Sequence, residues 1–375
     1  MSTHLRRRDW LKQSSLALAG LTFAGKLSAS DNDTKIVSRH TGNPLDVPIK
    51  LTSNENPYGP SPFARKAMAE AVAISNRYPL DNTTVLCDHI GKHFGLSGDH
   101  VLLGAGSTQI LALAATYAAL EKGNLVTAEP TFQTCIRVAE RKGVQIIKVP
   151  LSAAKKYELN PLLSKMNNST RLVFLCNPNN PTGTVLPSAD VKAFIEEASK
   201  KCMVLLDEAY TEYCDQPTLS GMVASNKNLL IAKTFSKIYG LAGARIGYAL
   251  AHPDTIVKLE RLLPWPNGDV SAVSIAGAIA SLEDKDFVKS TVSLNREAGD
   301  YTMKELKSLG FECIPSSTNF LYHSLGSYTG NWMEEMKKKN VLALRLIEEN
   351  GKWTRITIGT MPEMQAFIAA AKQIV

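Results

Sequence analysis

The sequence is short of cysteine, and the cysteines that it has form no recognisable pattern. The 375 residues include 6 cysteines, too few for a disulfide scaffold, and no two have the CxxC spacing of a metal or redox site. His89 and His93 are spaced as ligands on one helix face, but the glutamate that an HExxH site needs after His89 is absent. We therefore expect no metal.

The chain also lacks an internal repeat, a low-complexity tract, a zinc-finger spacing and an aromatic-basic RNA motif. Residues 1–30 hold five basic side chains and one aspartate, which leaves +3 of the formal net charge of +7 for the remainder. Such a weak excess argues against nucleic-acid binding. The apolar stretch at 16–24 is too short to span a bilayer, so no stable membrane span is expected.

The first thirty residues have the order of features found in a twin-arginine export signal. Arg7-Arg8-Asp9-Trp10-Leu11-Lys12 precedes the apolar stretch, and the small residues Ser28-Ala29-Ser30 follow it. We expect export to the periplasm with cleavage after residue 30. A basic amphipathic helix is the alternative, and the protein would then be cytoplasmic.

Short apolar runs alternate with segments of helical length through the middle of the chain. Seven candidate strands lie at residues 101–103, 125–128, 145–149, 172–176, 203–206, 229–232 and 245–251. This alternation predicts an α/β fold with a largely parallel seven-stranded sheet that is covered by helices on both faces.

The pattern changes beyond residue 262, where Pro264, Pro266 and Gly268 interrupt it. A long helical region to about residue 309 follows, and then short strands around 311–314, 320–323, 341–344 and 353–358. A chain of this length exceeds a single core. We expect an N-terminal arm and small-domain segment at 31–75, a large domain at 76–262 and a small α+β domain at 263–375.

Polar residues follow several of the predicted strands, and parallel strands would bring them to one edge of the sheet. Gly104-Ala105-Gly106-Ser107-Thr108 joins a strand to a helix expected from residue 109 and could bind an anion, or could be an ordinary turn. It matches neither the dinucleotide nor the P-loop motif. Phe132, Asn180 and Asp207 follow later strands, where plain turns and helix caps are the alternatives.

Lys237 lies just past the strand at 229–232, in a glycine-bearing turn. A desolvated lysine there can lose its proton and condense with an aldehyde, whereas a solvated loop lysine would do neither. Arg345 and Arg355 lie in or beside short strands, where a guanidinium could hold a carboxylate or phosphate. The proline-rich segment at 51–60 is irregular and either connects or binds.

Four motifs in order resemble those of fold-type I pyridoxal-phosphate aminotransferases, most closely the histidinol-phosphate aminotransferase branch. They are Asn-Pro-Asn-Asn-Pro-Thr-Gly at 177–183, Asp-Glu-Ala-Tyr at 207–210, Thr-Phe-Ser-Lys with Gly-Leu-Ala-Gly-Ala-Arg-Ile-Gly-Tyr at 234–248, and Arg-Ile-Thr-Ile-Gly at 355–359. The resemblance extends from about residue 51 to the end.

The resemblance implies that Lys237 binds the aldehyde of pyridoxal 5'-phosphate and later moves a proton. Asp207 would pair with the ring nitrogen, which makes the ring an electron sink. Tyr210 and Asn180 would hydrogen-bond the phenolic oxygen of the cofactor, and Phe132 would stack on its ring. The domain at 76–262 would be the cofactor-binding domain.

The resemblance also implies a phosphate site, a substrate site and a homodimer. The phosphate would be held by Ala105, Gly106, Ser107, Ser236 and Arg245, and by Tyr58 from the second subunit. The substrates would be an amino acid and a 2-oxo acid, with Arg355, Arg345 and Asn56 binding them. A decarboxylase or racemase on the same fold, and a non-catalytic binding protein, are the alternatives.

Two departures from the branch fall on the substrate side. Ser107-Thr108-Gln109 replaces the usual Ser-Asp-Glu, and Pro264-Trp265-Pro266-Asn267-Gly268-Asp269-Val270 replaces a Pro-Tyr/Phe-Asn-Val stretch. Together with the expected export, they favour an ordinary amino acid donor over histidinol phosphate.

Overall fold

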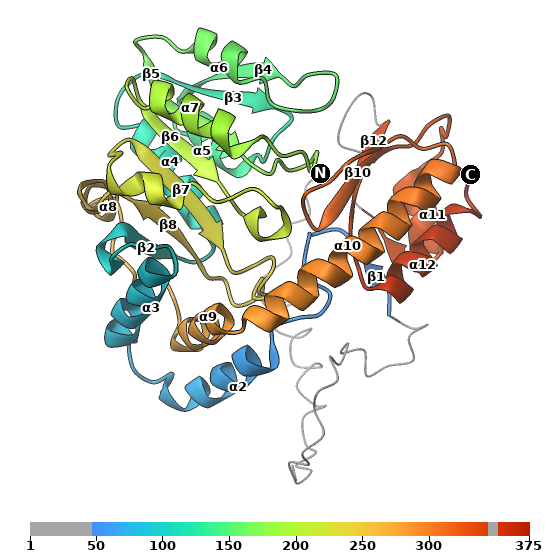
Figure 1. Ribbon diagram of the computed structural model, residues 1–375, viewed down its shortest axis with the longest axis horizontal. Coiled ribbons are helices and arrows are strands. Elements are labelled where there is room, and N and C mark those ends of the chain that lie inside the picture. Colours follow the sequence, from blue (N-terminus) through green and yellow to red (C-terminus); the bar gives the residue numbers. More distant parts are fainter. Residues whose placement is uncertain (1–46, 344–351) are drawn as a thin grey trace, which may run out of the picture. The chain divides into compact units, whose positions relative to one another are not determined.

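A seven-stranded sheet is the central element of the computed structural model, which describes residues 47–343 and 352–375 (Figure 1). In chain order the strands are β2 (Val101–Gly104), β3 (Asn124–Glu129), β4 (Gln145–Pro150), β5 (Thr170–Cys176), β6 (Met203–Asp207), β7 (Leu229–Thr234) and β8 (Gly247–Ala251). Their spatial order is β2-β8-β7-β6-β5-β3-β4. Within this sheet β8 runs antiparallel to both neighbours, and the remaining pairs are parallel. The predicted α/β fold with a largely parallel sheet is confirmed.

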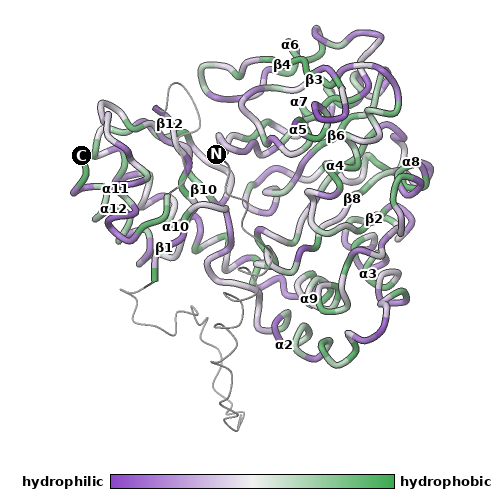
Figure 2. The backbone as a smooth tube through the Cα atoms, turned by 180° about the vertical axis from the view of Figure 1, so that it is seen from behind, coloured by the Kyte–Doolittle hydropathy of each residue, from purple (hydrophilic) through white to green (hydrophobic). Residues whose placement is uncertain are grey.

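Helices cover both faces of the sheet because successive strand residues point to opposite sides. On one face lie α3 (Leu80–His93), α6 (Leu159–Lys165), α7 (Ser188–Ala198) and α9 (Ala272–Glu283), and on the other lie α4 (Ser107–Ala118), α5 (Thr134–Arg141) and α8 (Pro253–Glu260). Strand β6 shows the alternation, since Val204 and Leu206 join the first core and Leu205 joins the second. Hydrophobic residues accordingly gather in the sheet, whereas many outer loops are hydrophilic (Figure 2).

The helical region expected up to residue 309 consists of two helices, α9 and α10 (Lys285–Ser308). Ile275, Ala278 and Leu282 recur on one side of α9 and join the core beneath the large sheet. Helix α9 also packs along α2 (Pro62–Ala71), which Ser61 caps by accepting a hydrogen bond from the Ala64 N–H. The packing of the large lobe therefore includes α9, although the small domain was expected to begin at residue 263.

A second lobe is built on the three-stranded antiparallel sheet β12-β10-β9. Its elements are β9 (Cys313–Ile314), β10 (Phe320–Ser324), α11 (Trp332–Lys338), β12 (Trp353–Thr357) and α12 (Met361–Ala371), with α10 packed against them. Strand β11 (Val341–Leu342) instead pairs in parallel with β1 (Ile49–Lys50), a two-residue strand that the sequence did not predict. The segment from residue 49 is thereby tied to the small lobe. Short 3₁₀ turns complete the described chain at Val72–Ile74, Gly98–His100, Thr211–Tyr213 and Ser220–Ala224.

The carboxyl ends of the parallel strands meet at one edge of the large sheet. There Cys176 lies opposite Asp207, and Asp207 lies opposite Ala232. Because β8 is antiparallel, its first residue Gly247 lies at the same edge, opposite Gly104 and Thr234. The segments that follow β2, β3, β5 and β6, together with the segment that joins β7 to β8, therefore share this edge.

Candidate active site

Lys237 lies in the turn between β7 and β8 and is partly buried. Its Nζ donates a hydrogen bond to the Ser53 carbonyl at 3.2 Å and lies 5.7 Å from the centroid of the Tyr210 ring. Burial, followed by the charge of Arg355, lowers the pKa of this amine to about 8, although Glu55 and Asp207 oppose the shift. Lys237 is therefore not an ordinary solvated lysine, and a neutral nucleophilic amine is accessible near neutral pH.

Asp207 is the last residue of β6, and its carboxylate is buried without a cation. One oxygen accepts a hydrogen bond from the Ala209 N–H at 3.1 Å, and among the described residues the side chain makes no ion pair. Burial raises the pKa of Asp207 to about 7, even though the Ala209 hydrogen bond, Lys237 and Lys233 lower it. A cationic ligand group would stabilise the charged form.

The Tyr210 hydroxyl is held by two amides. It accepts hydrogen bonds from Asn180 Nδ2 at 3.2 Å and Asn54 Nδ2 at 3.0 Å. Burial raises the pKa of Tyr210, so that the phenol stays protonated at neutral pH. With two incoming hydrogen bonds on its oxygen, Tyr210 keeps its own proton to donate to a ligand.

Asn54 is a member of this group that the sequence did not predict. Its φ of 53° is unusual for a residue other than glycine, and Thr357 of β12 holds it there through hydrogen bonds with its backbone N–H and its Oδ1. Asn54 belongs to the segment at 51–60, for which connection and binding were both open. The sequence showed only that this polar segment contains an asparagine, and it did not indicate which residue the asparagine would contact.

Arg355 extends from β12 toward the same group. Its NH1 donates to Asn180 Oδ1 at 2.6 Å, and its NH2 donates to the Thr52 carbonyl at 2.8 Å. Its Nε is buried without a partner, and within the described chain the guanidinium faces no carboxylate. Burial accordingly lowers the pKa of Arg355. Arg345 lies outside the described residues.

The start of α4 forms a cradle for an anion. Gly106, the residue before the helix, has a φ of 81°, and no side chain caps the first helical N–H groups. A Cβ at Gly106 would collide with the guanidinium of Arg245. Uncapped N–H groups at Ser107 and beyond, close to an arginine, suit a phosphate.

Arg245 is fixed by neutral partners on both sides of the cradle. NH2 donates to the Ala105 carbonyl at 3.3 Å and to Thr108 Oγ1 at 3.0 Å, and NH1 donates to Ser236 Oγ at 3.4 Å. The N–H of Ala105 donates instead to Gln109 Oε1 at 2.6 Å. Ala105 therefore orients Arg245 through its carbonyl, and its N–H is already occupied. The helix begins at residue 107 rather than at the predicted residue 109.

Three predicted residues lie outside this cluster of hydrogen bonds. Phe132 is partly buried against the core that contains α4 and α5. The Asn56 amide is occupied by two backbone groups, because Nδ2 donates to the Ile238 carbonyl at 2.8 Å and Oδ1 accepts from the Tyr58 N–H at 3.0 Å. Asn56 therefore anchors its loop beside Lys237 instead of offering a free amide to a substrate. Burial raises the pKa of Tyr58, and the charges of Glu363 and Glu297 add to the rise. Among the described residues, the Tyr58 side chain makes no hydrogen bond to the cradle.

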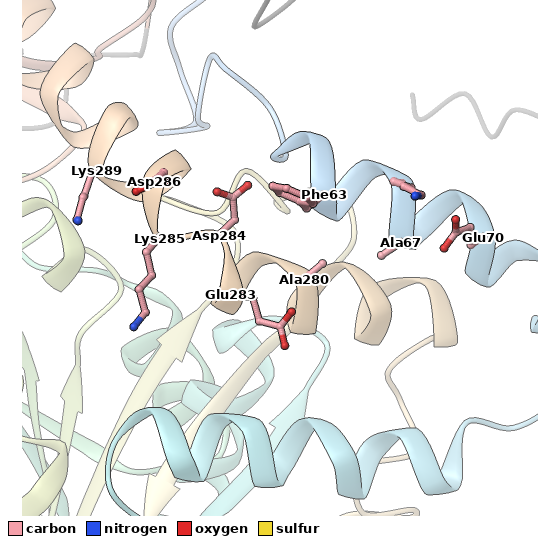
Figure 3. Close-up of a pocket in the computed structure, with 10 residues that line it drawn as sticks. Phe63, Ala67, Glu70, Ala280, Glu283, Asp284, Lys285, Asp286 and Lys289 are labelled. Carbon is pink, nitrogen blue, oxygen red and sulfur yellow. The ribbon is translucent and has the colours of Figure 1, made fainter. Parts of the chain in front are cut away.

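A separate hollow of about 690 Å³ lies between α2, α9 and the start of α10 (Figure 3). Charged side chains of both signs line it, with Phe63 beside them, and no predicted site residue is among them. Within residues 47–343 and 352–375, no cluster of His, Cys, Asp and Glu could hold a metal ion, and no helix is long and apolar enough to cross a membrane. His89 hydrogen-bonds the Val85 carbonyl.

The fold and the site define the class of protein. A lysine and a buried aspartate at the carboxyl edge of a mostly parallel sheet, beside a glycine-arginine cradle, are the arrangement of a fold-type I pyridoxal-phosphate enzyme. Residues 46–371 match the model of aminotransferase class I and II, and the chain belongs to this family.

Individual relatives agree over nearly the whole chain. The chain is 35% identical over 368 residues to histidinol-phosphate aminotransferase 1 of Dechloromonas aromatica, covering 96% of this chain and 99% of the relative. It is 35% identical over 326 residues to an aromatic amino acid aminotransferase of Rhodococcus jostii, covering 86% and 89%. The crystal structure of histidinol-phosphate aminotransferase from Sinorhizobium meliloti in complex with pyridoxal-5'-phosphate superposes with a TM-score of 0.81 at 25% identity, covering 92% of this chain and 98% of that one.

The protein is therefore a pyridoxal-phosphate-dependent aminotransferase that acts on small-molecule substrates, which confirms the predicted activity and cofactor. The decarboxylase, racemase and non-catalytic alternatives are set aside. The residues present fit the cofactor. The unpaired carboxylate of Asp207 suits a protonated ring nitrogen, Lys237 supplies an amine of lowered pKa, and only a glycine at 106 leaves room for Arg245 beside the cradle.

Proposed function

We propose that the enzyme transfers an amino group between an amino acid and a 2-oxo acid, and that Arg355 holds the carboxylate of both. The supporting observation concerns the guanidinium of Arg355, which is half-buried, donates to two neutral oxygens and has a buried Nε without a partner. A planar guanidinium binds a carboxylate through two parallel hydrogen bonds, and the charge of the substrate would offset the cost of burying the arginine.

The groups around Arg355 have distinct roles in this proposal. Bound pyridoxal phosphate supplies an electron sink for the substrate carbanion. Lys237 would hold the cofactor through its aldehyde and would carry the proton removed from the substrate Cα. Asp207 would keep the ring nitrogen protonated, and Tyr210 and Asn180 would donate hydrogen bonds to the phenolic oxygen. Asn54 holds the Tyr210 hydroxyl in position for this.

The phosphate would lie at the start of α4. Ser107 offers its backbone N–H group, Arg245 offers its charge, and Ser236 lies beside Arg245. The Gly106 N–H already donates to the Gly104 carbonyl at 2.7 Å, so Gly106 contributes by leaving room for Arg245. Ala105 acts by orienting Arg245. Phe132, on the segment that follows β3, would cover one face of the ring.

The two departures from the histidinol-phosphate branch support an amino acid donor, because they place a carboxylate beside the phosphate cradle. The two segments are in contact through one hydrogen bond. Gln109 Nε2 donates to an oxygen of Asp269, and Asn267 Oδ1 accepts from the Leu103 N–H at 2.8 Å. The carboxylate of Asp269 adds negative charge beside the phosphate cradle, which disfavours a second phosphate on the substrate. The Rhodococcus jostii relative, named for aromatic amino acids, also supports this class of donor.

The test uses holoenzyme and a panel of single amino acids, with conversion of the bound aldehyde to the amine followed by absorbance. We expect several amino acids to convert it and histidinol phosphate to be a poor donor. Arg355→Met should slow conversion by amino acids about a hundredfold, because it removes two charge-assisted hydrogen bonds, and Arg355→Lys should retain more activity. Equal effects of Arg355→Met on amino acids and on an amine without a carboxylate would contradict the carboxylate role.

We also propose that the enzyme is a homodimer in which Tyr58 completes the phosphate site of the partner. Large apolar side chains are exposed on α2, on the 3₁₀ turn that follows it, near the start of α3 and on the loop after residue 263. They are Phe63 at 67%, Val72 at 62%, Tyr78 at 76%, Leu80 at 55% and Trp265 at 41% exposed. Such a group of residues supports burial against a second copy.

Mixing two impaired variants tests whether the two subunits share their sites. Tyr58→Phe should weaken cofactor binding, and Lys237→Ala should abolish turnover. If Tyr58 acts across the interface, a hybrid dimer contains one site with both native residues, so refolding the two variants together should restore activity. A monomeric protein, or a mixture without recovered activity, would contradict the proposal.

Finally, we propose that residues 1–30 direct export through the twin-arginine route, which carries folded proteins and so suits an enzyme already loaded with cofactor. The order of the paired arginines, the apolar stretch and the small residues supports this. These residues lie outside the described part of the structure. Fractionation of the full chain should find it in the periplasm, and Arg7→Lys with Arg8→Lys should retain it in the cytoplasm. Cytoplasmic location of the unaltered chain would refute export.

A further inference from the structure

A buried charged network lies directly behind the strand ends that carry Asp207 and Lys237. Lys233 of β7 is 3% exposed, and its Nζ lies 3.3 Å from Glu208 Oε2 and 3.1 Å from Glu212 Oε1. Glu208 also accepts hydrogen bonds from Thr218 Oγ1 and from the Leu219 N–H at 3.1 Å. No step of the proposed reaction uses these three charged residues.

The position of the network links it to the site. Glu208 immediately follows Asp207, the last residue of β6, and Lys233 immediately follows Ala232, the residue of β7 that lies opposite Asp207. Lys233 is also four residues before Lys237. The ion pair between Glu208 and Lys233 therefore joins the two neighbouring strand ends from which the aspartate and the lysine of the site extend.

The network also acts on Asp207 through charge. Lys237 and Lys233 lower the pKa of Asp207, whereas Glu208 raises it, and burial remains the largest cause of its rise to about 7. Burial lowers the pKa of His93, which also interacts with Lys233 and Glu212. The remaining titratable groups around Asp207 and the network are tyrosines and cysteines whose pKa values are raised by burial, namely Tyr210, Tyr213, Tyr239, Tyr248, Cys135, Cys176 and Cys214. Removing Lys233 alone would leave two carboxylates without their cation and favour a protonated Asp207.

We propose that Lys233 is a positioning residue, which acts through Glu208 and Glu212 to fix the strand ends of the site and to keep the Asp207 carboxylate ionised toward the cofactor ring nitrogen. The proposal rests on the proposed role of Asp207. This role is distinct from a contribution to stability alone. Removing the charge of Lys233 should raise the pKa of Asp207, whereas removing the charge of Glu208 should lower it.

The test compares holoenzymes of Lys233→Met, Glu208→Gln, the double variant and Lys233→Arg. One readout is protonation of the ring nitrogen, followed by NMR with cofactor isotopically labelled at that atom, and the other is the pH dependence of the cofactor dissociation constant. Lys233→Met should move the pH midpoint of binding upward. If the pKa of Asp207 rises by about one unit from about 7, its ionised fraction at neutral pH falls about fivefold, and binding should weaken by the same factor. Glu208→Gln should move the midpoint downward, the double variant should lie near the native enzyme, and Lys233→Arg should restore native values.

Asp207→Asn separates the two proposals. If this variant leaves the ring nitrogen protonated as in the native enzyme, the role of Asp207 fails and the inference fails with it. If Asp207→Asn changes the ring nitrogen but Lys233→Met and Glu208→Gln shift the midpoint in the same direction or not at all, the inference alone is overturned. Should Lys233→Met not fold, a downward shift in Glu208→Gln supports the inference, and an unchanged or raised midpoint overturns it.

Discussion

The lowered pKa of Lys237 predicts how fast the protein without cofactor captures pyridoxal phosphate. Only the neutral amine attacks an aldehyde, and the pKa of Lys237 is about 8 against a usual value of 10.5. At neutral pH this difference makes the neutral fraction about 300-fold larger than for an ordinary lysine. The rate of capture should therefore rise with pH and level off above about 8, well before the usual lysine range.

The perturbation is Arg355→Met, with Arg355→Lys as the matched control that keeps the charge. Because burial is the largest cause of the shift and Arg355 the second, the methionine variant should raise the pKa of Lys237 without restoring its usual value. Capture at neutral pH should slow about tenfold if Arg355 accounts for about one pKa unit, and the plateau should move upward. The lysine control should remain close to the native profile.

The assay is stopped-flow absorbance of protein freed of cofactor and mixed with excess pyridoxal phosphate across the pH range. Lys237→Ala gives the background from surface lysines. A native rate that keeps rising through the usual lysine range would refute the lowered pKa. A methionine variant with the native profile would refute the part assigned to Arg355.

Three further outcomes are expected. Gly106→Ala should weaken cofactor binding at least tenfold by equilibrium dialysis, because its methyl group collides with Arg245 and its φ of 81° disfavours a side chain; unaltered binding would contradict the cradle. Asn54→Ala should lower the rate of the half-reaction by less than Asn180→Ala does. Asn180 bonds both Tyr210 and Arg355, whereas Asn54 bonds Tyr210 but not Arg355. A larger effect of Asn54→Ala would contradict this reasoning. Burial lowers the pKa of His323 to about 4, so as the pH falls the histidine is protonated in the unfolded chain before it is protonated in the folded one. The free energy of unfolding should therefore fall by about 3 kcal/mol between about pH 6.5 and pH 4. In chemical denaturation His323→Phe should lack this part of the loss, and an identical pH profile in both proteins would disprove it.

The large sheet could be predicted from the sequence because its strands, except the edge strand β4, are buried on both faces. Each then appears as a continuous apolar run, as in 172–176 and 203–206, and the polar residues that follow mark the shared edge. Strand β1 was missed because two residues carry no periodicity, and its pairing with β11 joins segments almost three hundred positions apart. The helical region after 270 was predicted as helix, but the break at Asp284 and the packing of α9 on the large lobe depend on tertiary contacts.

For the site, the motifs located the residues but not their partners. Lys237, Asp207, Tyr210, Asn180 and Arg355 were all named, whereas the occupied amide of Asn56 could be seen only in the structure.

Lys233 was overlooked because it sits inside an apolar run, and its carboxylate partners lie 25 and 21 positions earlier in the chain. Asn54 was overlooked because its hydrogen bond to Tyr210 spans 156 positions. Local pattern cannot reveal contacts of this length.

Strand β12 carries Arg355, which bonds Asn180, and two residues later Thr357, which hydrogen-bonds Asn54. Asn54 in turn donates a hydrogen bond to the Tyr210 hydroxyl. Replacing the small lobe with that of another enzyme, in order to change the acceptor, would therefore remove the hydrogen bonds between Thr357 and Asn54 in the segment at 51–57. Moving that stretch together with its lobe is the exchange most apt to leave a working enzyme.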